Sequence, residues 1–66
     1  MRYKIREIRK KKRISQTELA KMAGVSRQTI VNLETKEDVE TTTGTLMAIA
    51  NALGVSVKSL FFVESV

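Results

Sequence analysis

The chain has 66 residues, of which 42% are hydrophobic and 29% are charged, and its formal net charge is +5 at pH 7. A chain of this length is expected to form a single domain over residues 1–66 with one small core. The sequence contains neither Cys nor His, which excludes disulfides and thiolate zinc sites and removes the commonest general base and metal ligand. We therefore expect no enzyme activity, no metal site and no cofactor, and no small-molecule effector is evident.

No apolar run is long enough to cross a membrane, and the basic N-terminal segment is not followed by the apolar run of a signal peptide. The expected location is the cytoplasm. A basic helix lying on a membrane surface is an alternative, but the apolar face of the first predicted helix holds only Ile5 and Ile8. Because that face also lacks Trp, its insertion into a membrane would be weak.

Charge is distributed unevenly along the chain. Residues 2–13 carry eight Lys or Arg and one Glu, whereas residues 34–40 carry four acidic residues and one Lys. A basic segment of this density is typical of a nucleic-acid-binding protein. A solvated face of a charged helix would explain the same basic run, so charge alone does not decide between the two.

In chain order, residues 2–12 predict a first helix with Ile5 and Ile8 toward the core. Ser15 precedes Glu18 by three residues, the spacing of a capping box, and predicts the start of a second helix over residues 16–23. Gly24 is placed to end that helix in a left-handed conformation. Ser26 is placed to cap a third helix over residues 27–35. Two helices joined by a short turn with Gly indicate a helix-turn-helix.

The segment from Ser15 to Thr35 resembles the helix-turn-helix of the lambda-repressor and Cro-like family of DNA-binding proteins. The pattern that carries the resemblance is a small residue, a turn glycine, a closing acid and four apolar positions, namely Ala20, Gly24, Glu34, Leu19, Val25, Ile30 and Leu33. A plain helical hairpin in a small bundle is the alternative. Several independent positions agree with the family pattern, and their agreement favours the helix-turn-helix.

The rest of the chain predicts a loop over residues 36–41, a fourth helix capped by Thr42 that runs to about Leu53, and a short fifth helix, VKSLF, capped by Ser56. The apolar tail FVESV is compatible with a short strand. The expected fold is therefore all-α, with the five helices of a lambda-repressor-like domain. Similar proteins often place Lys or Arg in the loop to contact phosphates, so Glu37, Asp38 and Glu40 depart from the family. Either the loop points away from DNA or the affinity for DNA is low.

On the third helix, four residues are predicted to lie on one exposed face and to contact bases in the major groove: Arg27, Gln28, Val31 and Asn32. Arg can bind guanine in a bidentate fork, Gln and Asn can bind adenine, and Val can touch a thymine methyl group. A polar surface without a ligand would explain the three polar residues but not the exposed Val31. The candidates for DNA phosphate contacts are Gln16, Thr17, Ser26, Thr29 and Lys36.

Three further expectations follow from the resemblance. Gln16 is placed where the family uses a Gln to contact the DNA backbone. Arg9 and Glu34 are placed where similar proteins pair the first helix with the end of the recognition helix, which implies a structural pair. Arg13 falls where the family often has Gly just past the first helix, so a left-handed conformation there would cost about 1–2 kcal/mol relative to glycine.

The sequence therefore predicts a regulator, most simply a repressor, that binds double-stranded DNA as a homodimer on a near-palindromic operator. Surplus apolar residues at the C-terminus predict the dimer interface at Leu60, Phe61, Phe62 and Val63. If both Phe residues instead fill the core of one chain, this surplus disappears. An antitoxin or accessory protein-interaction module with secondary DNA binding is the alternative function, and the acidic loop and apolar tail would be its contact surfaces.

Overall fold

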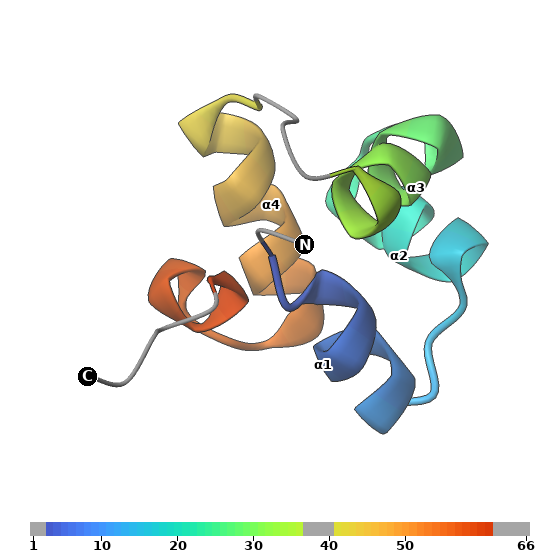
Figure 1. Ribbon diagram of the computed structural model, residues 1–66, viewed down its shortest axis with the longest axis horizontal. Helices are drawn as coiled ribbons and strands as arrows, with labels where there is room; N and C mark the ends of the chain where they lie inside the picture. Colours follow the sequence, from blue (N-terminus) through green and yellow to red (C-terminus); the bar gives the residue numbers. More distant parts are fainter. Residues whose placement is uncertain (1–2, 37–40, 62–66) are drawn as a thin grey trace.

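The computed structural model describes residues 3–36 and 41–61. In this part of the chain it has four α-helices, α1 (Ile5–Lys11), α2 (Gln16–Ala23), α3 (Arg27–Thr35) and α4 (Thr43–Leu53), followed by the 3₁₀ turn η1 (Val57–Leu60). Helices α2 and α3 form a compact pair, and α4 packs against α2 (Figure 1). The all-helical class agrees with the prediction. The predicted short fifth helix is a single 3₁₀ turn, so four of the five predicted helices are α-helices in the described part of the chain.

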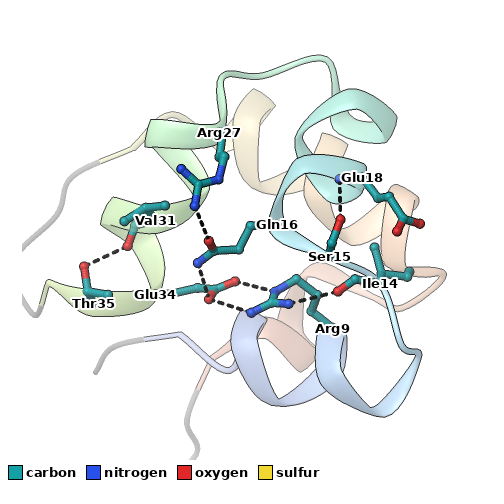
Figure 2. A network of polar contacts seen from close by, with 9 residues as sticks. All are labelled: Arg9, Ile14, Ser15, Gln16, Glu18, Arg27, Val31, Glu34 and Thr35. Atoms are coloured by element: carbon teal, nitrogen blue, oxygen red, sulfur yellow. Dashed lines mark hydrogen bonds and ion pairs between the residues drawn. The ribbon is translucent and has the colours of Figure 1, made fainter.

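Three helices begin at a hydroxyl cap. Ser15, Ser26 and Thr42 have extended backbone conformations, and their side chains accept hydrogen bonds from the backbone N–H three residues later. Such caps satisfy donors that have no partner within the helix, and each typically contributes about 1 kcal/mol. At the start of α2 the carboxylate of Glu18 points away from Ser15 (Figure 2). Of the two hydrogen bonds of the predicted capping box, the structure has the one from the Glu18 backbone N–H to the Ser15 hydroxyl.

Three helix ends also share one geometry. The backbone N–H groups of Ile14, Val25 and Val55 donate to carbonyls five residues earlier, at Arg9, Ala20 and Ala50. The residue before each donor is left-handed: Arg13 has φ 57°, and the two glycines at positions 24 and 54 have φ 69°. This is the Schellman motif, which glycine adopts without strain. The first helix therefore ends in the same way as the other two, but with an arginine in the strained position.

Helix α1 is shorter than predicted at its N-terminal end. It begins at Ile5, because Tyr3 instead forms an isolated antiparallel β-bridge with Phe61. The backbone N–H of Lys4 donates to the carbonyl oxygen of Leu60, and the rings of Tyr3 and Phe61 pack at a centroid distance of 5.3 Å with an interplanar angle of 54°. This contact joins the two ends of the described chain beside α1.

The core lies between the helices and draws on every described element. Its fully buried aliphatic side chains are Ile5, Leu19, Ile30, Leu33, Ile49, Leu53 and Leu60. Full burial of one such side chain contributes roughly 1.5–3 kcal/mol. Ala20 is also buried in the core, and its small side chain lets α2 and α3 pack closely. The core therefore fixes the orientation of α3 relative to α1 and α2.

Some of the predictions fall on parts of the chain outside the described residues. They are the role of the acidic residues 37–40, the strand in the tail, and the interface residues Phe62 and Val63.

Candidate nucleic-acid interface

Helix α3 presents the four predicted base-reading side chains on one face. Arg27 and Gln28 are exposed at its first turn, and Val31 and Asn32 are half-buried one turn later. The opposite face carries Ile30 and other core residues that hold the helix against α2. Recognition helices usually contact bases through their N-terminal half. Arg27 and Gln28, which are exposed at the start of α3, therefore have the position expected of base-contacting residues.

Beneath this face, Arg9 of α1 and Glu34 of α3 form a two-bond ion pair. The Arg9 Nε atom donates to Glu34 Oε2 at 2.8 Å, and Nη2 donates to Oε1 at 3.0 Å. Arg9 Nη1 also donates to the carbonyl oxygen of Ile14 at 2.9 Å, so the guanidinium supports the connection between α1 and α2 as well. The Glu34 side chain is only 1% exposed. A fork of this kind fixes orientation as well as distance.

Gln16, the first residue of α2, connects the ion pair to the exposed end of α3. Its Nε2 atom donates to Glu34 Oε1 at 3.1 Å, and its Oε1 atom accepts from Arg27 Nη2 at 3.3 Å. Figure 2 shows the resulting chain of contacts from Arg9 through Glu34 and Gln16 to Arg27. The structure thus brings together a residue predicted to contact phosphate and a residue predicted to contact bases.

Gln28, the second exposed residue that is predicted to contact bases, is also held by a neighbour. Gln28 Nε2 donates to Asn32 Oδ1 at 2.9 Å, a contact between residues one helical turn apart. Arg27 and Gln28 therefore each have a side-chain partner that restricts their conformations. Preordered side chains lose less conformational entropy when they bind.

The other phosphate candidates lie at the helix ends. Thr17 is exposed in the first turn of α2, and Lys36 is exposed directly after α3. Ser26 is exposed and its hydroxyl lies 2.8 Å from that of the half-buried Thr29, while it also caps α3. Ser26 and Thr29 thus have structural partners, whereas Thr17 and Lys36 are exposed.

A pocket of about 400 Å³ lies beside the ion pair. Its lining includes Arg6 and Lys10 from α1, Ser15 and Gln16 from the start of α2, and Glu34 and Thr35 from the end of α3. The Glu34 carboxylate in this pocket is already paired with Arg9. The exposed side chains of Arg6 and Lys10 therefore give the rim of the pocket a positive charge. From the sequence, Arg6 and Lys10 were considered only as members of the basic segment over residues 2–13. Their spacing of four residues, which places them on one helix face, was the available signal.

The predicted interface residues at the C-terminus differ in their environments. Leu60 is fully buried in the core of its own chain, whereas the sequence predicted it at a surface shared with a second chain. Phe61 is half-buried and packs on Tyr3 and the core. Leu60 and Phe61 are the two described residues of the predicted interface. Of these, only Phe61 has an exposed part of its side chain that a second chain could contact.

No helix among the described residues is long and apolar enough to span a membrane. A search of curated proteins found no significant match. The model of the helix-turn-helix family matches residues 5–60, which include all four α-helices and η1. This family consists of DNA-binding regulatory domains and not typically of enzymes. The chain therefore belongs to the lambda-repressor and Cro-like family of helix-turn-helix proteins, and its general role is that of a regulator of transcription that binds double-stranded DNA.

Proposed function

We propose that this protein is a sequence-specific repressor that binds as a homodimer to a near-palindromic operator. The observation that carries the proposal is the ordered face of α3. There, Arg27 is held by Gln16, and Gln28 is held by Asn32. Side chains of these two types match the hydrogen-bonding edges of guanine and adenine in the major groove. A half-site that contains adjacent or near-adjacent G·C and A·T pairs is the expected target.

Repression is the simplest mode of action for such a domain, because a protein that occupies an operator excludes polymerase without further machinery. A homodimer follows from the size of the reading surface, since one recognition helix contacts only a few base pairs. Two copies related by a two-fold axis double the contact and give a near-palindromic site. In this proposal the cytoplasm remains the predicted location, and residues 1–66 remain one predicted domain.

The test is a selection of bound sequences from a random DNA pool, followed by binding measurements with single variants. Arg27→Ala and Gln28→Ala should each weaken binding to the selected site by about 1–3 kcal/mol and relax the preference at one base pair. Lys58→Ala, an exposed change on η1 away from α3, is the matched control. If both α3 variants discriminate between the selected and a scrambled site as well as the control does, the assigned reading face is wrong.

A further inference from the structure

We propose that Arg13, in the turn between α1 and α2, binds a phosphate of the DNA backbone, and that this contact explains an arginine at a strained backbone position. The proposal rests on the proposed function, because it takes the same DNA duplex as the ligand. It adds a contact outside α3 and outside the residues that the sequence singled out for phosphate binding.

The backbone of Arg13 is strained where the same protein elsewhere uses glycine. Arg13 has φ 57°, whereas Gly24 and Gly54, at the corresponding positions of the two other Schellman motifs, have φ 69°. A residue with a Cβ atom is strained in this conformation and glycine is not. The fold alone therefore favours glycine at position 13, and the arginine needs another explanation.

The side chain of Arg13 contributes little to the fold. It is exposed, and among the described residues it forms no hydrogen bond or ion pair. A cation just past the end of a helix interacts favourably with the helix dipole, but this contribution is usually smaller than the cost of the left-handed conformation. Strained residues of this kind occur often at functional sites. The role of the Arg13 side chain is therefore expected outside its own chain.

The turn that carries Arg13 is fixed to α3 through one guanidinium. Arg9 Nη1 donates to the carbonyl oxygen of Ile14 at 2.9 Å, and the backbone N–H of Ile14 donates to the carbonyl oxygen of Arg9 at 3.1 Å. The same guanidinium forms two hydrogen bonds with Glu34 near the end of α3 (Figure 2). The strained turn and α3 therefore share one anchor, so a phosphate contact by Arg13 would fix the position of α3 on the duplex.

The charge around Arg13 identifies the partner as an anion. Residues 10–13 are four consecutive cations, and no acidic residue occurs over residues 8–17. Lys10 and Ser15, on either side of the turn, both line the pocket beside the buried ion pair. A guanidinium can bind phosphate through two parallel N–H donors, and phosphate contacts position a protein without reading sequence. Arg13 is therefore assigned to the DNA backbone and not to a base.

The experiment separates the charge of Arg13 from its backbone strain. Arg13→Gln keeps a Cβ atom and a long side chain but removes the charge, whereas Arg13→Gly removes both the charge and the strain. Each variant should weaken binding to the selected and to a scrambled duplex about 3- to 10-fold at physiological salt, and should reduce the salt dependence of log K by about one unit. Only Arg13→Gly should also raise the midpoint of thermal unfolding. Fluorescence anisotropy measures the binding, and circular dichroism measures the unfolding.

Gly54→Arg is the matched control, because it places the same side chain in the same strained conformation at the end of α4. An added Cβ at Gly54 would meet no atom within 4 Å. This variant should lower the midpoint of unfolding and leave the salt dependence of binding unchanged. A gain in salt dependence for Gly54→Arg as large as the loss for Arg13→Gln would mean that net charge governs binding, and it would overturn the inference.

Two other results would overturn the inference while the proposed function stands. Unchanged affinity and salt dependence for Arg13→Gln would mean that Arg13 does not contact DNA. A midpoint of unfolding that falls by several degrees for Arg13→Gln would mean that the side chain is needed for the fold. If the wild type itself does not discriminate between the selected and the scrambled duplex, the proposed function fails, and the salt dependence still decides whether Arg13 contacts the DNA backbone.

Discussion

The guanidinium of Arg9 and the carboxylate of Glu34 lie face to face in a two-bond pair that joins α1 to the last turn of α3. Both residues are buried, and among the described residues every buried side-chain nitrogen and oxygen has a hydrogen-bond partner. A buried pair of this kind is costly to break because removing one partner leaves an uncompensated charge. The pair therefore holds α3 against α1.

Glu34→Ala should lower the free energy of unfolding by about 3–5 kcal/mol, because it leaves the Arg9 charge without its carboxylate. Urea unfolding followed by circular dichroism measures this loss. Glu18→Ala, which removes an exposed carboxylate, is the control and should change stability by less than about 0.5 kcal/mol. The double variant Arg9→Met/Glu34→Leu should be far less destabilised than Glu34→Ala. Equal losses for Glu34→Ala and Glu18→Ala would show that the pair contributes nothing.

Arg13→Gly should stabilise the fold. Arg13 has φ 57° and an exposed side chain, so its replacement removes backbone strain of about 1–2 kcal/mol. The greater entropy of glycine in the unfolded chain offsets part of this gain, which leaves a net increase of up to about 1 kcal/mol. Thermal unfolding of the variant beside the wild type measures the difference.

The matched variant, Gly54→Ala, should lower the stability of the protein. At Gly54, with φ 69°, an added Cβ would meet no atom within 4 Å, so Gly54→Ala tests the backbone strain without a steric clash. We expect a loss of about 1–2 kcal/mol. A loss of stability on Arg13→Gly would contradict the prediction. It would mean that the arginine side chain stabilises the end of α1 by more than the backbone strain destabilises it.

The pocket rim predicts a contribution of α1 to DNA binding. Arg6→Gln and Lys10→Gln should each weaken binding to all sequences alike and reduce the salt dependence of log K by about one unit, since each would release one fewer counterion. Lys58→Gln on η1 is the charge-matched control. Fluorescence anisotropy at a series of salt concentrations gives the slopes. Equal slopes for all three variants would place the DNA backbone away from this pocket.

The proposed dimer is tested by analytical ultracentrifugation of the wild type beside Phe62→Asp. We expect the wild type to form dimers at micromolar concentration and the variant to be monomeric, because a charge in an apolar interface is costly. In the complex the two recognition helices should lie about 34 Å apart, one turn of DNA. A folded wild type that stays monomeric at high micromolar concentration and binds DNA with one-to-one stoichiometry would contradict the proposal.

Local signals in the sequence were sufficient to predict the starts of α2, α3 and α4 and the ends of α2 and α4. Ser15, Ser26 and Thr42 cap these helices, and Gly24 and Gly54 end two of them, in geometries that depend on a few neighbouring residues. The start of α1 was wrong because Tyr3 pairs with Phe61, and no local pattern reports a partner so far along the chain. The sequence did not distinguish the 3₁₀ turn at η1 from a short α-helix, because the two have similar side-chain patterns over only four residues.

The candidate site was predictable in its residue types and in the Arg9–Glu34 contact, which the resemblance implied, but not in its other internal contacts. The helical period places Arg27 and Gln28 on one face of α3. The contact of Arg27 with Gln16 depends on how α2 and α3 pack, and the contact of Gln16 with Glu34 depends on where α3 ends. These relationships arise from tertiary structure, and for that reason the sequence assigned Gln16 to the DNA backbone alone.

The bridge between Tyr3 and Phe61 also bears on how the molecule folds and opens. It closes almost the whole chain into one loop, and the entropic cost of closure rises with loop length. The helices have mainly local contacts and can form first, so we expect the bridge to form late, after the core has assembled. Once formed, it makes the two ends a single cooperative unit. The Lys4 amide, which donates to Leu60, should then exchange its hydrogen when that unit opens and not by fraying of one end.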